Sequence, residues 1–385
     1  MPPLPQIAAY HDELVAIRHD IHRHPETAFE ELRTAAIVAE RLAAWGVEVH
    51  QGIGRTGVVG TLRSGSSARA VGLRADMDAL DMEELNGFDH RSTVPGKMHG
   101  CGHDGHTAML LGAARYLSVT RAFDGTVHFI FQPAEEGGGG AREMIDEGLF
   151  ERFPVDGVYG LHNAPSLSFG SFAVAPGPVM ACADEFRVTI TGAGGHAAFP
   201  HMAVDPVSIA GEIIVALQSI VSRTIDPLES AVVSVTRLRA GDAANVIPES
   251  AEMVGSARAL TPAVRDAIEA GIARLAGGIA AAHGASADIA YERGYPPTVN
   301  HAAESEIAAR AAAAVAGAEN VGNHWLPIMG SEDFSFMLEE RPGCYAFIGI
   351  GEDRAMCHSP RYDFNDDILA LGASYWVRLV ETTLA

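Results

Sequence analysis

Gly100-Cys101-Gly102-His103-Asp104-Gly105-His106 leads into an apolar stretch whose spacing predicts a helix over Gly105–Leu117. Short apolar segments before and after this helix predict strands at Val58–Leu62, Ala70–Arg74, Thr126–Phe131 and Gly157–Leu161. Other segments with helical spacing lie at Glu13–Ile21, Thr34–Trp45 and Gly140–Glu147. Strands that alternate with helices are typical of an α/β fold, in which helices cover both faces of a central sheet.

The pattern changes from about Cys182. A strand over Glu185–Thr191, a helix over Asp205–Arg223 and two strands follow, and then a helix and a last strand. This order, β-α-β-β-α-β, is typical of a ferredoxin-like α+β unit. Helix–strand alternation resumes after it, at Glu304–Ala316. We therefore expect a discontinuous larger α/β domain over 1–181 and 294–385, interrupted by an inserted domain over 182–293.

Composition excludes several classes of partner. The 385 residues contain 27 Lys and Arg against 49 Asp and Glu, a formal net charge of −22. A surface this acidic repels nucleic acid and anionic lipid, so we expect neither as a partner. The N-terminal residues do not resemble a secretory signal, and no apolar run approaches the ~20 residues that span a bilayer. With four irregularly spaced cysteines, a cytoplasmic location is expected.

Residues able to bind metal follow several of the predicted strands. Cys101 and His103 are two residues apart between glycines, so that a thiolate and an imidazole can face one cation. In open α/β sheets, ligands bind beyond the carboxyl ends of the strands. The side chains that follow strands in this chain are Asp76, Asp78, Glu135, Glu136, His162 and His358. Their common placement predicts one metal site, with two ions.

The mixture of ligand types narrows the choice of metal ion. One thiolate, three imidazoles and a carboxylate suit Zn, Mn, Co or Ni better than Mg or Ca. A pair of such ions polarises a carbonyl and activates water, and a glutamate beside the ligands can move the proton. A different chemistry stays open at this point, a metal-free amidase with Cys101 as nucleophile and His103 as its base. A third alternative is a non-catalytic metal-binding protein.

Five motifs together resemble the M20 peptidase family, and the resemblance covers essentially the whole chain. They are Arg74-Ala-Asp-Met-Asp78, Met98-His-Gly-Cys-Gly-His-Asp-Gly-His-Thr-Ala-Met109, Gln132-Pro-Ala-Glu-Glu136, Leu161-His-Asn163 and Cys357-His-Ser-Pro360. The similarity is to the branch of hippurate hydrolases, N-acyl amino acid amidohydrolases and plant indole-acetyl-amino acid hydrolases. It implies cleavage of the amide bond of N-acyl amino acids, aromatic acyl groups included. Deacetylation of N-acetyl-diaminopimelate and dipeptide cleavage by the same machinery remain alternatives.

The resemblance also implies a role for each site residue. It implies two divalent metals held by Cys101, His103, Glu136, His162 and His358. Glu135 becomes the general base and acid, while Asp76, Asp78 and Asp104 orient the ligands. His106 is expected to be structural. Asp81 departs from the family, which commonly has proline there, and this substitution puts the fine substrate preference in question.

The inserted segment resembles the family's dimerisation or lid domain, which implies a homodimer or a higher homo-oligomer. Within it, Gly194-Gly-His-Ala-Ala-Phe-Pro-His201 resembles a segment whose histidine stabilises the oxyanion, and this makes His196 the candidate. Asn245 and Arg258 match positions that bind the substrate carboxylate, which Arg can do with two hydrogen bonds. Gly330-Ser-Glu-Asp-Phe334 also matches the branch, and no step is assigned to it.

Overall fold

The computed structural model describes residues 3–322 and 327–385. The chain forms two compact units. Unit 1 comprises Met1–Gly177, Val299–Leu326 and Asp333–Ala385, and unit 2 comprises Pro178–Thr298 and Pro327–Glu332. Each unit has its own buried apolar core.

Unit 1 is built on an eight-stranded mixed sheet in the order β1-β2-β4-β3-β5-β16-β6-β15. The bounds of these strands are β1 Glu48–Ile53, β2 Gly57–Ser64, β3 Ala70–Asp76, β4 Gly125–Gln132, β5 Gly157–Ala164, β6 Phe172–Ala173, β15 Val321–Gly322 and β16 Gly343–Gly349. The central strands β4, β3, β5 and β16 are parallel to one another, whereas β1, β2 and β6 pair antiparallel. The carboxyl ends of the four parallel strands therefore meet at one edge of the sheet.

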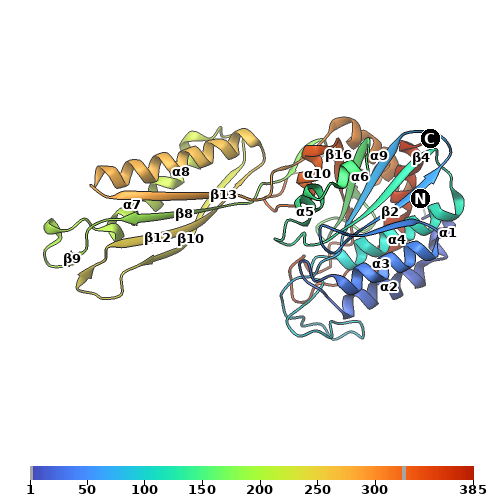
Figure 1. Cartoon of the computed structure of the whole chain (residues 1–385), viewed down its shortest axis with the longest axis horizontal. Helices are drawn as coiled ribbons and strands as arrows, with labels where there is room; N and C mark the ends of the chain where they lie inside the picture. The colour runs from blue at the N-terminus through green and yellow to red at the C-terminus, as the bar shows by residue number, and fades with distance from the viewer. Residues whose placement is uncertain (1–2, 323–326) are drawn as a thin grey trace. The chain divides into compact units, whose positions relative to one another are not determined.

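Helices cover both faces of this sheet (Figure 1). The helices are α1 Pro5–Ala8, α2 His11–Arg23, α3 Leu32–Ala44, α4 His103–Thr120, α5 Gly140–Asp146, α6 Leu149–Arg152, α9 Ala302–Ala316, α10 Phe334–Glu340 and α11 Leu369–Thr383, with 3-10 turns at Ala318–Asn320 and Asp366–Ile368. The predicted α/β class is confirmed. Of these helices, α4 is buried almost all round, because α2, α3 and α11 enclose it on the side away from β3.

Unit 2 is a four-stranded antiparallel sheet in the order β10-β12-β8-β13. Its elements run β8 Asp184–Thr191, α7 Pro206–Ser219, β10 Ala231–Ala240, β12 Ser250–Ala259, α8 Pro262–Ala282 and β13 Ser286–Arg293. This is the β-α-β-β-α-β order that the sequence predicts. Shorter elements are β9 Gly195–His196, paired with β11 Val246–Ile247, and the helical turns Pro200–Met202 and Ile220–Thr224. Strands β7 Gly177–Met180 and β14 Thr298–Asn300 form a separate two-stranded sheet.

One helical segment, Pro206–Thr224, is long and apolar enough to cross a membrane by length and composition. Its apolar residues divide between two faces. Ile209, Ile213 and Leu217 are fully buried or nearly so in the core of unit 2, whereas Val215 is 73% exposed. The buried face is apolar because it packs in the core of unit 2. The exposed face, which includes Val215, is apolar for a different reason.

The structure differs from the sequence prediction at particular places. His162 lies inside β5 and not beyond it, because β5 continues to Ala164 in register with β16. Asp76 is likewise the last residue of β3. Strand β1 and helix α10 were not predicted. The structure also assigns 178–181, 294–298 and Pro327–Glu332 to unit 2, all outside the expected inserted domain over 182–293.

Candidate metal centre and active site

The metal-binding candidates of unit 1 lie together at the carboxyl ends of the parallel strands. Ligand atoms of Cys101, His103 and His162 all lie within 4.8 Å of one another, as do those of Cys101, Glu136 and His358. The Cys101 thiol is 3.4 Å from Nε2 of His162, and Nε2 of His358 is 3.0 Å from Oε1 of Glu136. Cys101 belongs to both groups, so the two sets adjoin and could hold two cations.

The start of α4 fixes where Cys101 and His103 point. Gly102 precedes the helix with a φ of 95°, a conformation that favours glycine. A Cβ at this position would lie 2.1 Å from the side-chain oxygen of Asn163 and 2.5 Å from the hydroxyl of Tyr362. Glycine is therefore required here both by the backbone turn and by the close approach of Asn163.

His103 shows that this site suits a cation. Its Nδ1 lies 2.9 Å from the carbonyl oxygen of Asp78 and donates to it, which turns Nε2 toward the cluster. Within residues 3–322 and 327–385, the buried Nε2 atom has no hydrogen-bond partner. It lies 3.8 Å from Oδ2 of Asp76 and 4.0 Å from Oε1 of Glu136, distances that leave room for an ion between these atoms.

The electrostatics of the cluster also favour a bound cation. Burial works to lower the pKa of His103, but Asp76, Asp78 and Glu136 outweigh it and hold this pKa well above its usual value. Burial and the nearby His106 ring keep the pKa of His162 well below its usual value, so its imidazole is neutral and able to bind metal. The carboxylates therefore attract a positive charge to the centre of the cluster.

Glu135 and Glu136 lie on the loop between β4 and α5, and both are close to His103. Glu135 is 7% exposed. The backbone N–H of Glu136 donates to Oδ2 of Asp78 at 2.9 Å, so that one aspartate orients both His103 and this loop. One carboxylate of the pair can bind metal while its neighbour handles a proton.

Asp76 and Asp104 are both fully buried, and they differ in what they contact. Asp76 accepts from Arg74 at 2.7 Å and from Nδ1 of His106 at 2.6 Å. Asp104 accepts instead from Arg18 at 3.2 Å and from Nδ1 of His22 at 2.8 Å. Both aspartates fix the first turn of α4. Asp76 does so through its hydrogen bond to His106, and Asp104, which is itself part of this turn, through its bonds to Arg18 and His22.

Several buried polar residues of the site were missed by sequence reasoning. Arg18 lies in the helix predicted over Glu13–Ile21, and His22 lies just beyond that range but within α2. Asn163 ends the Leu161-His-Asn163 motif, and no role was predicted for it. Nε2 of His106 accepts from the backbone N–H of Asn163 at 3.1 Å and lies 2.7 Å from the side-chain oxygen of Asn163, so that both ring nitrogens of His106 are engaged. The signal for Arg18 was a charged residue on the apolar face of a predicted helix.

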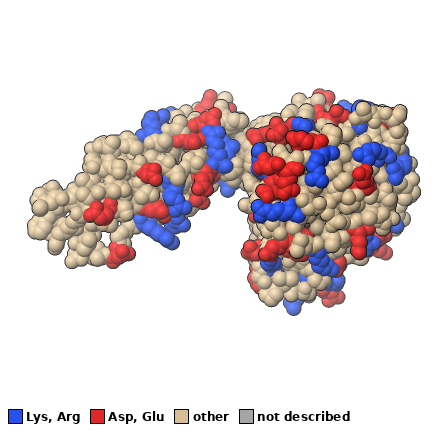
Figure 2. All heavy atoms as spheres, in the orientation of Figure 1, with Lys and Arg blue, Asp and Glu red and all other residues tan. Residues whose placement is uncertain are grey.

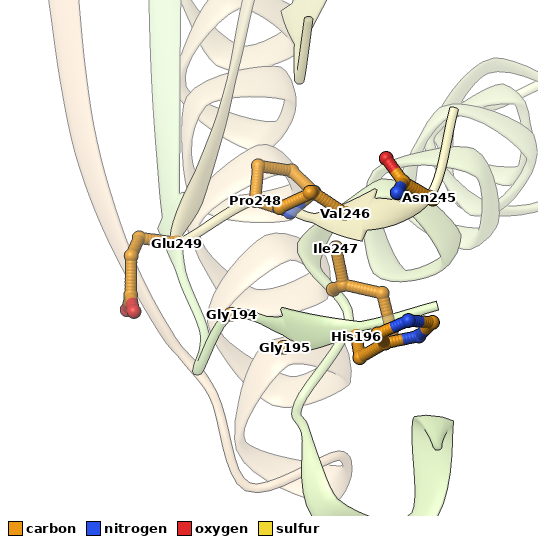
Figure 3. Close-up of a pocket in the computed structure, with 8 residues that line it drawn as sticks. All are labelled: Gly194, Gly195, His196, Asn245, Val246, Ile247, Pro248 and Glu249. Carbon is orange, nitrogen blue, oxygen red and sulfur yellow. The ribbon is translucent and has the colours of Figure 1, made fainter. Parts of the chain in front are cut away.

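The remaining candidates lie in unit 2. His196 in β9 and Asn245 just before β11 line a hollow of about 450 Å³, together with Gly194, Gly195 and Val246–Glu249. Figure 3 shows the side chains of His196 and Asn245 at the same end of the paired strands. His196 is exposed, and its Nδ1 accepts from the N–H of Ala198 at 3.1 Å, which leaves Nε2 to face solvent. Arg258 donates to the hydroxyl of Ser331 at 3.2 Å.

Comparison with known proteins places the chain in a family. Residues 72–382 match Peptidase family M20/M25/M40. The chain belongs to this family.

Its relatives are similar over nearly their full length. A hippurate hydrolase of Campylobacter jejuni is 43% identical over 376 residues, covering 98% of each chain. An N-acetylcysteine deacetylase of Bacillus subtilis is 38% identical, again covering 98% of each chain. The crystal structure of a dinuclear metal-binding M20 peptidase from Bacillus subtilis matches with a TM-score of 0.87 and 34% identity, covering 98% of this chain and 99% of that one.

Metal binding by this cluster should depend on pH. The hydrogen bond that the Cys101 thiol donates to Cys357, together with burial, raises the pKa of this thiol well above its usual value, and the pKa of His103 is also raised. Both groups must lose a proton to bind a cation, so affinity should weaken as the pH falls and binding should release protons. Calorimetric titration of Zn²⁺ or Mn²⁺ in two buffers of different ionisation enthalpy measures this release. Cys101→Ser should release fewer protons, and equal release by both proteins would contradict the assignment of Cys101 as a ligand.

Proposed function

We propose that this protein is a metal-dependent amidohydrolase that cleaves the amide bond of N-acyl amino acids, giving a carboxylic acid and a free amino acid. The observation that carries the proposal is the adjoining ligand clusters with Glu135 beside them. The names of the similar proteins, a hippurate hydrolase and an N-acetylcysteine deacetylase, indicate the substrate class. Aromatic acyl groups of the benzoyl kind are the first to test.

The ligands that we propose are Cys101, His103, Glu136, His162 and His358, for two divalent ions. The orphaned Nε2 of His103 and the raised pKa of its ring support a cation at this position. The mixture of thiolate, imidazole and carboxylate favours Mn, Zn, Co or Ni. Such ions polarise the scissile carbonyl and make water a better nucleophile.

Glu135 performs the proton transfers. As a carboxylate it accepts a proton from the attacking water, whose oxygen forms a bond with the carbonyl carbon of the substrate. It then passes this proton to the amide nitrogen as the C–N bond breaks, so that the products are a carboxylic acid, which keeps the second proton of the water, and an amine; transfer of that second proton gives a carboxylate and an ammonium group. Its near-complete burial restricts exchange of the proton with bulk water, which supports this role.

Residues of unit 2 bind the substrate and the developing charge. His196 stabilises the oxyanion, for which its solvent-facing Nε2 is suited, and Asn245 beside it contacts the substrate. Arg258 binds the substrate carboxylate. Its guanidinium keeps further donors beyond the one that contacts Ser331, so it can bind a carboxylate with two hydrogen bonds.

The rival with Cys101 as a metal-free nucleophile fits the site less well. A nucleophilic cysteine needs a lowered pKa, whereas the pKa of Cys101 is raised by its contact with Cys357 and by burial. Deacetylation of N-acetyl-diaminopimelate and dipeptide cleavage use the same machinery, and a substrate panel separates them. A cytoplasmic location is supported by the free thiols of all four cysteines, each of which lies in the described part of the chain.

We also propose that the protein is a homodimer formed through unit 2. Val207 and Val215 on α7, Met202 before it and Leu228 after it are 42%, 73%, 78% and 95% exposed. In the view of Figure 2, the surface of unit 2 around β9 carries few charged side chains, whereas unit 1 carries many of both signs. Burial of such apolar residues against a second copy would be favourable. Light scattering should give twice the monomer mass, and Val215→Glu should reduce it.

The two neighbouring glutamates should behave differently when substituted. Glu135→Gln removes the base but keeps the shape of the site, so turnover should fall by about 10²–10⁴ while two metal ions stay bound. Glu136→Gln removes a ligand, so the metal content itself should fall. Metal analysis and kcat measured on the same samples separate these effects. Full turnover by the Glu135 variant would rule it out as the base.

The role of His196 has its own kinetic signature. His196→Ala should lower kcat by about 10²–10³, because a donor that stabilises an oxyanion acts mainly in the transition state. His201→Ala, in the same Gly194–His201 segment, is a nearby control and should keep the wild-type activity. A change confined to KM would show that His196 binds the substrate without stabilising the oxyanion.

A further inference from the structure

The loop that carries Glu135 and Glu136 runs from the end of β4 at Gln132 to the start of α5 at Gly140. Four consecutive glycines, residues 137–140, form its second half. A glycine-rich segment is intrinsically soft, because glycine has the widest choice of backbone conformations. The position of Glu135 must therefore be set by contacts with the rest of unit 1.

Asp333 ties the two ends of this loop together. Its Oδ1 accepts from the side-chain amide of Gln132 at 2.8 Å, and its Oδ2 accepts from the backbone N–H of Ala141 at 2.9 Å. Arg74 donates to Oδ1 as well, at 3.1 Å. Asp333 is fully buried and lies nearly two hundred residues beyond the loop in the sequence.

Glu31 holds the middle of the loop. Its Oε1 accepts from the backbone N–H of Ala134 at 2.9 Å and from that of Phe29 at 3.0 Å. Its Oε2 accepts from the hydroxyl of Thr56 at 2.6 Å. Ala134, directly before Glu135, has a φ of 52°, an unfavourable conformation for alanine that persists only where surrounding contacts impose it.

We infer that Glu31 and Asp333 are positioning residues that hold the loop so that Glu135 can reach the reacting atoms. The inference rests on the proposed function, in which Glu135 transfers the proton. It also gives the Gly330–Phe334 motif a role, since Asp333 is its fourth residue. Neither carboxylate is a proposed metal ligand or contacts substrate in this account.

The hydrogen-bond partners of the two carboxylates predict opposite responses to amide substitution. Each oxygen of Asp333 accepts from N–H donors, so the NH₂ group of Asp333→Asn must point at a donor and break at least one contact. One oxygen of Glu31 faces a hydroxyl, which can accept as well as donate. Glu31→Gln can therefore keep its contacts by reversing the Thr56 bond, whereas Glu31→Ala loses them all.

Glu26 provides a matched control. Its two carboxylate oxygens accept from the backbone N–H groups of Arg33 and Thr34 at 2.9 and 2.8 Å. Glu26→Gln therefore also places an amide against a backbone donor, but the hydrogen bonds of this side chain are to the start of α3 and not to the loop. It should lower the melting temperature without changing the chemical step.

The experiment measures kcat, KM, metal content and melting temperature for the full-length, metal-loaded protein with an N-acyl amino acid that the wild type hydrolyses. Asp333→Asn and Glu31→Ala should lower kcat by about 10²-fold, the effect expected when a catalytic group is displaced by about 1 Å. Their KM and metal content should stay near those of the wild type. Glu31→Gln and Glu26→Gln should retain the wild-type kcat. If Asp333→Asn does not fold, the comparison of kcat between Glu31→Ala and Glu31→Gln tests the inference.

Each other outcome counts against the inference. If Glu31→Ala has the kcat of Glu31→Gln, the carboxylate does not position Glu135. If kcat recovers fully once extra metal is added, the residues support only the metal site. Turnover by the wild type together with unchanged kcat in the variants overturns this inference alone. Absence of turnover by the wild type with every metal and substrate tried overturns the proposed function, and this inference falls with it.

Discussion

The structure depends on a concentration of negative charge that is buried inside unit 1. Asp76, Asp78 and Glu136 converge on the ring of His103, and unpaired charges are costly away from water. A protein can meet this cost with a proton or with a cation. These carboxylates raise the pKa of His103 and so favour a proton there, and a bound metal would offset the same negative charge. The affinity for metal and the proton equilibrium of the site are thus two consequences of one electrostatic constraint.

The fold meets this constraint by bringing strand ends together. Strands β3, β4, β5 and β16 are parallel, and so the side chains near their carboxyl ends come from distant parts of the chain to one edge. Gly102 lets α4 begin close against Asn163, which places Cys101 and His103 on the same side. A surrounding set of buried ionic contacts then fixes the ligands. Removing one partner from such a contact leaves the other charge buried and unpaired, so each contact constrains the geometry strongly.

This convergence could be predicted from the sequence, because each strand and the residues that follow it are recognised from a short local pattern. A strand is recognised from its own apolar residues, and the residue that follows it must lie at the edge of the sheet. For that reason Glu135, Glu136 and His358 could be expected near Cys101, and the structure brings ligand atoms of Glu136 and His358 to Cys101 and those of Glu135 to Glu136 and His103. The roles assigned to them remain proposals. His162 was expected beyond its strand but lies within it, because pairing with β16 extends β5 past the point where its apolar pattern ends.

The supporting contacts could not be predicted in the same way. Asp333 and the loop it ties are nearly two hundred residues apart, and no periodic pattern connects them. Arg18 bonds to Asp104 across 86 residues, and its charge within an apolar helix face was the single local sign that it needed a partner. The addition of Pro327–Glu332 to unit 2 likewise depends on tertiary packing. Long-range pairings of polar side chains are specified by the folded structure as a whole.

The most direct test of the account is hydrolysis of N-benzoylglycine and a small panel of N-acyl amino acids by chelator-stripped protein and by the same protein reconstituted with Mn, Co, Ni or Zn. The account predicts that activity disappears on stripping and returns when metal is restored. Activity that is unaffected by stripping and is abolished by alkylation of Cys101 would contradict it, since the chemistry would then belong to the thiol.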